Sequence, residues 1–101
     1  MININAQEML SRLQNGERLN VLDVRGKIEY HTYNIGGKNI PLASLKDNLK
    51  ELEWNKTDEI IVICKAGLRS ATAKSILELN GYNNIRNLAG GLLALQKNQQ
   101  K

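Results

Sequence analysis

The stretch that most constrains the fold is an unbroken apolar run that stops at a cysteine. Residues Ile60–Ile63 form the run, and Cys64, the single cysteine of the chain, follows directly. A run without polar alternation is typical of a strand covered on both faces, as in parallel sheets. Gly67 permits a tight loop, and a helix is predicted from Ser70 onward. We therefore expect the thiol at the carboxyl end of a buried strand, where open α/β sheets bind ligands.

Strand and helix patterns alternate along the whole chain. This alternation predicts an α/β fold with a mostly parallel sheet and helices on both faces. A chain of 101 residues has too little length for a second core, so residues 1–101 are expected to form one domain, with 98–101 as a frayed tail. We predict strands at residues 2–4, 19–24, 38–40, 59–63 and 84–88, and helical segments at 6–13, 29–31, 42–52, 70–80 and 92–97.

Composition and charge exclude several classes of function. No apolar run of about 18 residues is present, which argues against a membrane span. The net charge of +4 is spread along the chain without interleaved aromatic residues, unlike a nucleic-acid-binding surface. The first residues lack the basic and apolar regions of a signal peptide, and one cysteine cannot form an internal disulfide. A cytoplasmic location is the expectation.

Cys64 is the main candidate for chemistry, and its alternative is a buried core cysteine. Its position argues against that alternative, because the thiol ends the apolar run instead of lying inside it. The backbone N–H groups of the loop can form an anion-binding nest, and the following helix adds a positive dipole end. Lys65 and Arg69 add full charges. All of these favour a thiolate, so we expect the pKa of Cys64 below its usual value.

Two chemistries suit a thiolate in such a loop: phosphoryl transfer through a cysteinyl phosphate and sulfur transfer through a persulfide. Four residues separate Cys64 from Arg69. The cysteine phosphatases use a loop one residue longer. The shorter loop makes a smaller pocket, which suits one extra sulfur better than a phosphate. This is a steric preference, and both chemistries stay open on the residues alone.

The loop Cys64–Ser70 resembles the active-site loop of the single-domain rhodaneses, which are thiosulfate:cyanide-type sulfurtransferases. Residues 21–25, 29–30 and 39–42 are similar to the N-terminal signature of that family, and residues 81–85 and 88–92 to its C-terminal signature. The chain departs from the family at Tyr33–Gly37, where Gly-His-Ile-Pro-Gly is usual, and at Leu95, where an aromatic residue is frequent. These departures concern packing more than chemistry.

The resemblance implies a rhodanese-like three-layer α/β/α fold with a central, mostly parallel five-stranded sheet. It implies that Cys64 takes a sulfane sulfur from a small anionic donor such as thiosulfate, or from a persulfide. The sulfur would then pass to a thiophilic acceptor, such as a thiol, cyanide or a sulfur-relay protein, with no cofactor or metal. The loop residues that would hold the substrate and the persulfide are Lys65, Ala66, Gly67, Leu68, Arg69 and Ser70.

Two alternatives remain beside this reading of the function. One is a sulfur-carrier or regulatory module with little turnover alone, and the less favoured one is a phosphatase- or arsenate-type cysteine enzyme. Asp23 and Arg25 end a neighbouring strand and are candidates for the rim of the site, although a structural role is favoured. His31, the single histidine, is expected to be solvated or locally bonded, and one Cys and one His fall short of a metal site.

Overall fold

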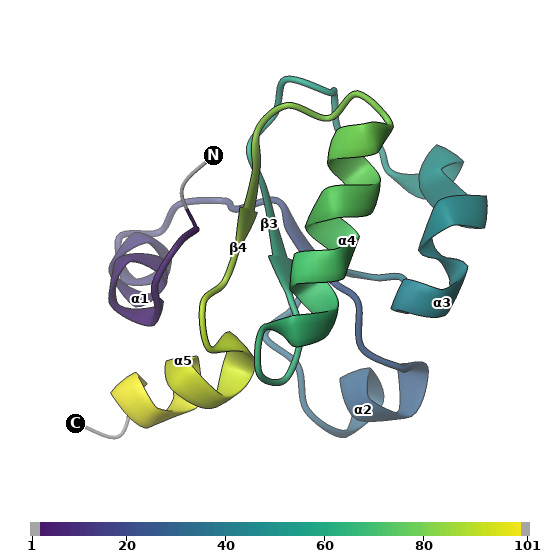
Figure 1. The fold of residues 1–101 in the computed structure, drawn as a ribbon. Helices are drawn as coiled ribbons and strands as arrows, with labels where there is room; N and C mark the ends of the chain where they lie inside the picture. The colour runs from purple at the N-terminus through teal and green to yellow at the C-terminus, as the bar shows by residue number, and fades with distance from the viewer. Residues whose placement is uncertain (1–2, 100–101) are drawn as a thin grey trace.

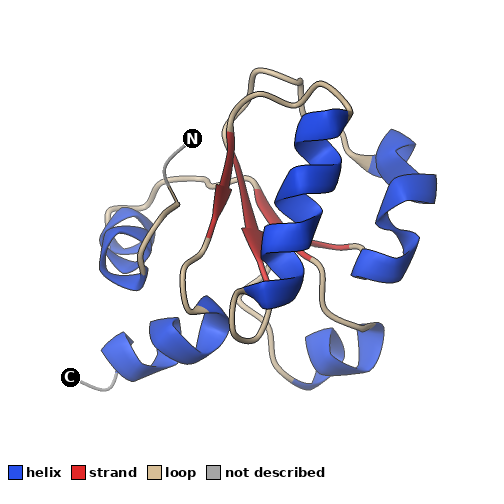
Figure 2. Cartoon of the chain, in the orientation of Figure 1, coloured by secondary structure: helices blue, strands red, loops and turns tan. Residues whose placement is uncertain are grey.

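A parallel sheet of four strands forms the centre of the molecule (Figures 1 and 2). The computed structural model describes residues 3–99. The strands are β1 (Val21–Asp23), β2 (Lys38–Asn39), β3 (Ile60–Ile63) and β4 (Ile85–Asn87). Their spatial order is β2-β1-β3-β4, and each neighbouring pair is parallel. All four carboxyl ends therefore meet at one edge of the sheet, as the α/β pattern predicts.

Helices cover both faces of this sheet, which confirms the three-layer fold. The helices are α1 (Ala6–Gln14), α2 (Lys27–Thr32), α3 (Leu42–Leu45), α4 (Leu68–Leu79) and α5 (Gly91–Gln99). Helices α1 and α5 pack on one face, α3 and α4 on the other, and α2 lies near the carboxyl edge (Figure 1). Within residues 3–99, no helix has the length and apolar character needed to cross a membrane.

The predicted fifth strand, residues 2–4, is reduced to a single parallel bridge between Ile4 and Leu88. The amide of Ile4 donates to the Asn87 carbonyl at 3.0 Å, and the Ile4 carbonyl accepts from Ala89 at 2.8 Å. Asn5 then caps α1, with its Oδ1 accepting from the amide of Glu8 at 2.7 Å. The helix begins so soon that only one residue can pair, and Ile2 lies outside the described residues.

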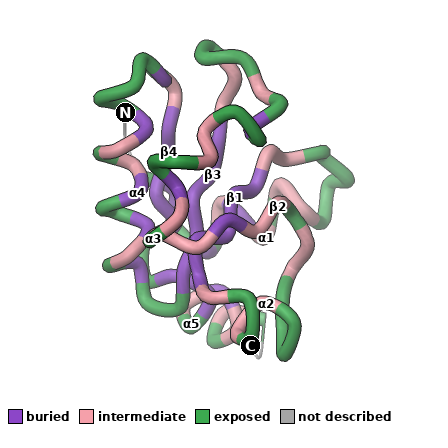
Figure 3. Tube along the Cα trace, turned by 90° about the vertical axis from the view of Figure 1, so that its right-hand side faces the viewer, coloured by how far each residue is buried: buried purple, intermediate pink, exposed green. Residues whose placement is uncertain are grey.

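The central strand β3 divides its side chains between two hydrophobic clusters. Ile60 and Val62 pack under α3 and α4, whereas Ile61 and Ile63 pack under α1 and α5. This is the period of two of a strand, and it explains why the run shows no polar alternation. Figure 3 shows the buried trace running through the middle of the molecule along β3 and β4. Cys64 continues the alternation and so faces the α4 side.

Two helical predictions differ from the structure in detail. The segment at residues 42–52 is not one α-helix, because after α3 it continues as a 3₁₀-helix over Lys46–Glu51. Asn48 has φ −123°, and its amide group donates to the Ser44 carbonyl at 2.7 Å, which competes with a regular α-helical path. At the C-terminus, Asn98 and Gln99 belong to α5 and not to a tail, while residues 100–101 lie outside the described part.

Candidate active site

The Cys64 sulfur lies at the carboxyl end of β3 and accepts hydrogen bonds from the loop that follows it. The Gly67 N–H donates to Sγ at 3.0 Å, and the Ser70 N–H donates to it at 3.4 Å. The hydroxyl of Ser70 lies 3.3 Å from Sγ. Only 1% of Cys64 is exposed, so these donors surround the sulfur almost without water. The result is a small, nearly dry cradle that suits a negatively charged sulfur.

The loop takes this shape because of two glycines. Gly67 adopts φ +98°, a conformation that side chains disfavour, and a Cβ there would lie 3.2 Å from the Gly90 nitrogen. Gly91 opens α5, and a Cβ at this position would lie 2.5 Å from the carbonyl oxygens of Cys64 and Lys65. The start of α5 is thereby held directly against the loop, with the Leu92 N–H donating to the Cys64 carbonyl at 2.9 Å.

The sulfur also takes the place of a capping side chain for α4. Gly67 is the N-cap of this helix and has no side chain to offer. Ser70 is the third helical residue, and its N–H, which an N-cap side chain would ordinarily accept, donates to Cys64 Sγ instead. The positive end of the helix therefore faces the sulfur.

Burial raises the pKa of the Cys64 thiol, but hydrogen bonds to the sulfur outweigh it, so the pKa lies below its usual value. The bonds that favour the thiolate come from the Ser70 hydroxyl, when its proton is directed at the sulfur, and from backbone N–H groups, including those of Ser70 and Gly67. The direction agrees with the prediction. The main cause is the hydrogen-bond cradle and not the two cationic side chains of the loop.

Arg69 does not bond to the sulfur in this structure, because its guanidinium forms a two-pronged ion pair with Glu29 of α2. The two N–O distances are 2.6 Å and 2.9 Å. The pair holds the pKa of Glu29 at about 2, first through this hydrogen bond. The Gly26 N–H also donates to the Glu29 carboxylate at 3.2 Å. Arg69 therefore ties the loop to the N-terminal turn of α2, with much of its charge compensated.

Asp23 and Arg25 form a second, buried ion pair at the end of β1. Arg25 Nη2 lies 2.8 Å from Asp23 Oδ2 and also donates to the Tyr33 carbonyl at 2.6 Å. The Arg25 backbone N–H donates to Asp23 Oδ1 at 3.0 Å. Charge-assisted bonds of this kind fix the backbone between β1 and the end of α2. These bonds are those of a structural role, and because Arg25 also lines a cavity with Lys65, the rim assignment of Asp23 and Arg25 stays a prediction.

The remaining loop residues face outward. Lys65, Ala66 and Leu68 are exposed, with Leu68 81% accessible. Lys65 lines a surface cavity of about 360 Å³ together with Arg25. The other lining residues come from α2, its C-terminal turn and α5: Ile28, Glu29, Thr32, Tyr33, Leu92, Leu93 and Gln96. This cavity beside the loop combines apolar side chains with the cationic side chains of Lys65 and Arg25.

Two residues beside the loop were not predicted as part of the site. Glu29 was noted in the sequence only as part of a signature, yet it holds Arg69. Asn87, at the buried end of β4, bonds to the loop through both atoms of its amide group. A polar residue at the carboxyl end of a strand that neighbours the cysteine strand is the signal that could have identified Asn87.

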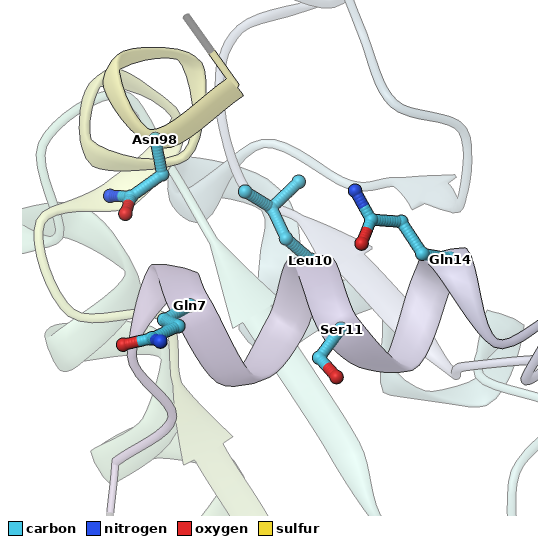
Figure 4. Close-up of a pocket in the computed structure, with 5 residues that line it drawn as sticks. All are labelled: Gln7, Leu10, Ser11, Gln14 and Asn98. Carbon is cyan, nitrogen blue, oxygen red and sulfur yellow. The ribbon is translucent and has the colours of Figure 1, made fainter. Parts of the chain in front are cut away.

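His31 is exposed and stacks edge-on against Tyr30 at 5.7 Å between ring centroids, as expected of a solvated histidine. Over residues 3–99, no three His, Cys, Asp or Glu side chains gather closely enough to hold a metal ion. A polar groove of about 440 Å³ lies elsewhere, between α1 and α5 (Figure 4). Its lining residues are Gln7, Leu10, Ser11, Gln14 and Asn98. It offers no charged group, and no titratable residue lines it beside the Ser11 hydroxyl.

Comparison with known proteins gives the same family for sequence and structure. Residues 5–98 match the family model described as Rhodanese-like domain. The chain is 39% identical to the thiosulfate sulfurtransferase PspE of Escherichia coli, an alignment that covers 70% of this chain and 68% of that protein. It is 33% identical to the putative sulfur carrier protein YrkF of Bacillus subtilis over 88% of this chain. That alignment covers 48% of YrkF, so the chain spans about half the length of this relative.

The fold has close matches among solved structures as well. A rhodanese-like domain protein from Staphylococcus aureus superimposes with a TM-score of 0.82 at 31% identity. The match covers 94% of this chain and 91% of that one. Sequence identity and shared topology over nearly the full length point to common descent and not to a chance likeness of α/β layers.

Proposed function

This chain belongs to the rhodanese-like family, its relatives include a protein named thiosulfate sulfurtransferase and one named putative sulfur carrier, and from that membership we propose a specific reaction for it. The protein moves a sulfane sulfur from a donor such as thiosulfate or a persulfide to a thiophilic acceptor. Cys64 carries the sulfur between the two as a persulfide. Thiosulfate as a donor is supported by PspE, which bears the name of a thiosulfate sulfurtransferase. We place this chemistry in the cytoplasm, where a single thiol stays reduced.

The reaction has two displacement steps. The Cys64 thiolate attacks the outer sulfur of thiosulfate, a sulfur–sulfur bond forms, and the donor's own sulfur–sulfur bond breaks with its electron pair leaving on sulfite. An acceptor thiolate or cyanide then attacks the outer sulfur of the persulfide. The bond to Cys64 Sγ breaks, and its electron pair returns the thiolate. No metal or organic cofactor enters either step.

The observation that carries the proposal is the set of donors aimed at one buried sulfur. The N–H groups of Gly67 and Ser70 lie 3.0 Å and 3.4 Å from Sγ and cost no reorganisation when charge appears there. Such fixed donors stabilise both the attacking thiolate and the leaving thiolate of the second step. The remaining N–H groups of the loop, from Lys65 to Arg69, are the candidates for holding the outer sulfur.

The position of Arg69 argues against phosphoryl transfer. A phosphate on Cys64 would carry two negative charges and call for a guanidinium that is free to hold it. Arg69 is instead held by both carboxylate oxygens of Glu29. The small size of the loop, with four residues between Cys64 and Arg69, supports the same choice.

A sulfur carrier with little turnover alone is the second candidate. It is favoured by the relative YrkF, which bears the name of a putative sulfur carrier protein. Both candidates use the same persulfide. They differ in what removes the sulfur: a small molecule in the enzyme, a docked protein in the carrier.

A panel of donors and acceptors tests the proposal. Wild-type protein should turn over thiosulfate or a low-molecular-weight persulfide with cyanide or a thiol, and Cys64→Ser should show no turnover. Slow turnover with every small acceptor, beside fast loading of Cys64, would favour the carrier. Hydrolysis of an aryl phosphate by the wild type but not by Cys64→Ser, without any sulfur loading, would overturn the proposal in favour of a phosphatase.

A further inference from the structure

The hydroxyl of Ser70 lies between two acceptors and has only one proton. Its Oγ is 3.3 Å from Cys64 Sγ and 2.5 Å from Asn87 Oδ1. Ser70 is completely buried and Asn87 is 6% exposed, so water does not supply a further partner. A serine hydroxyl donates one hydrogen bond and can accept two. The direction of this proton decides whether the hydroxyl presents a donor or a lone pair to Cys64 Sγ.

The orientation of the Asn87 amide is fixed by a second bond. Its Nδ2 donates to the Gly67 carbonyl at 3.1 Å, and a carbonyl oxygen can only accept. The nitrogen must therefore face Gly67, which leaves Oδ1 facing Ser70. Since Oδ1 also only accepts, the short contact requires Ser70 to donate to Asn87.

This arrangement suits a protonated sulfur. With its proton directed at Asn87, the Ser70 oxygen presents a lone pair to Sγ, and the thiol S–H can donate to it. A thiolate has no proton to donate and would instead meet that lone pair. Ser70 can stabilise the anion only by rotating its proton toward Sγ, which leaves the buried Oδ1 of Asn87 without a donor.

We propose that Asn87 is a positioning residue for the Ser70 hydroxyl. While Cys64 is protonated, Asn87 accepts the Ser70 proton and so directs it away from the sulfur. When Cys64 is a thiolate, that hydrogen bond breaks and Ser70 donates to the sulfur instead. In the first state the bonds run from Cys64 S–H to Ser70 Oγ and from Ser70 O–H to Asn87 Oδ1. In the second, the proton of the thiol has left to solvent, and Ser70 donates its own proton to Sγ. The same rotation serves each time Cys64 becomes a thiolate.

Two consequences follow for the acidity of the thiol. The Ser70 hydroxyl assists ionisation, but Asn87 opposes part of that assistance by competing for the proton. Asn87 therefore keeps the resting thiol less acidic than the loop alone would make it. Asn87 has no hydrogen bond to the sulfur itself, because its other bond goes to the Gly67 carbonyl, so Ser70 is its direct route to the thiol.

The charged groups around the loop do not account for such a coupling. Asp23 and Arg25 lie at the end of β1, Glu29 on α2, Lys65 on the loop and Arg69 in the first turn of α4. The pKa of Arg69 is raised first by its hydrogen bond to Glu29, and the negative charges of Cys64 and Asp23 add to this rise. All five charged residues are present in the variants of Ser70 and Asn87, so they affect the pKa of Cys64 in the same way in every protein compared.

The test is the pH dependence of alkylation of the single cysteine by iodoacetamide, which requires no sulfur donor and so is separate from the proposed reaction. Asn87→Leu, nearly the same size without the acceptor, should lower the midpoint by about one pH unit. Ser70→Ala should raise it by about one pH unit. In the double variant, Asn87→Leu should cause no further shift relative to Ser70→Ala.

Asn83→Leu is the matched control, because Asn83 is exposed just before β4, and it should leave the midpoint unchanged. A midpoint that stays or rises in Asn87→Leu, or the same downward shift in the Ser70→Ala background, would overturn the proposal. Asn87→Ala carries the same prediction if the leucine variant does not fold.

A measurement on the S–H stretch in the infrared needs no variant of Asn87. The chain has one cysteine, so the band has a single source. At a pH below the midpoint, the wild type should show the band of a hydrogen-bonded thiol, and Ser70→Ala should move it toward the position of a free thiol. An identical band in both proteins would show that the thiol does not donate to Ser70, and the proposal would fail.

Discussion

At the scale of single residues, the surroundings of Cys64 divide into neutral donors that touch the sulfur and charged groups that do not. The N–H groups of Gly67 and Ser70 point at Sγ, whereas the guanidinium of Arg69 is bound by Glu29. Half-exposed charges act through solvent and are screened. The cradle is therefore expected to set the reactivity of the sulfur, and the charges to adjust the approach of anions.

Arg69→Ala should consequently have a limited effect on thiosulfate use. Loss of one partly exposed charge should lower kcat/KM by at most about fivefold, corresponding to about 1 kcal/mol, and mainly through KM. Steady-state kinetics in low and high salt checks this. A decrease in kcat/KM of more than about a hundredfold would mean that Arg69 leaves Glu29 and contacts the substrate. If kcat and KM of Arg69→Ala equal those of the wild type, the charge of Arg69 has no role in the reaction.

The Glu29–Arg69 pair should also make a pH-dependent contribution to stability. The pKa of Glu29 in the folded protein is about 2, below its usual 4.5, so the contribution is present above about pH 4.5 and is lost as the pH falls toward 2. Because both side chains are partly exposed, Glu29→Gln should cost only about 0.5 kcal/mol at neutral pH. Urea unfolding of the two proteins should show this gap closing between those pH values; a gap that persists below them would contradict the assignment.

At the scale of elements, the tight turn from β3 into α4 depends on the left-handed conformation of Gly67. A side chain there would meet both an unfavourable φ and the backbone of Gly90. The same turn carries one of the two N–H groups on the sulfur. A change at this residue should therefore affect stability and thiol chemistry together.

Gly67→Ala should destabilise the protein by more than about 2 kcal/mol and raise the midpoint of Cys64 alkylation. The matched control is Gly16→Ala, since Gly16 also has a positive φ of 80° but nothing within 4 Å of the added Cβ. It should cost about 1 kcal/mol and leave the alkylation unchanged. Thermal unfolding measures the first quantity and iodoacetamide rates the second; equal losses in the two variants would refute the packing argument.

The elements were predictable where one local signal dominates. The β3 run, the Asn5 cap and the Cys64 loop were all read correctly in position, because strand pattern and capping act within a few residues. The helix at residues 42–52 was read as one α-helix because leucine spacing does not register the competing bond of Asn48. In the turn at Tyr33–Gly37, Asn34 Oδ1 accepts from the Gly36 N–H at 2.8 Å, which builds a local turn.

The sequence predicts the contacts within the Cys64 loop but not the contacts that other elements make with it. The sequence places Cys64, Gly67 and Ser70 together because they share one loop. The partners that come from other elements, Glu29 and Asn87, were not identified as such. Their contacts depend on the register of strands and the packing of α2, which single-sequence patterns do not contain.

At the scale of the whole molecule, the sheet separates two apolar cores that share its buried strands. One lies under α3 and α4 and includes Cys64, and the other lies under α1 and α5. The backbone of Gly91 at the start of α5 lies in close contact with the Cys64 loop. The loop is therefore in contact with both cores, through Cys64 on one face of the sheet and through α5 on the other. The five-stranded expectation was one strand too many, since Ile4 contributes a bridge and not a strand.

Two leucines of α4 allow the contribution of core packing to be measured apart from that of helix propensity. Leu77 is fully buried and Leu79 is 87% exposed on the same helix. Leu77→Ala should lower the free energy of unfolding by about 2–5 kcal/mol, because it leaves a cavity in the core that contains Cys64. Leu79→Ala should change it by less than about 0.5 kcal/mol. Equilibrium unfolding in urea measures both, and similar values for the two variants would show that α4 packs differently.

The central claim is that Cys64 carries the transferred sulfur, and intact-protein mass spectrometry after incubation with thiosulfate tests it most directly. The wild type should gain the mass of one sulfur, cyanide should remove it, and Cys64→Ser should gain nothing. The conservative change keeps the loop while removing the nucleophilic sulfur. A gain of one sulfur that persists in Cys64→Ser would contradict the account.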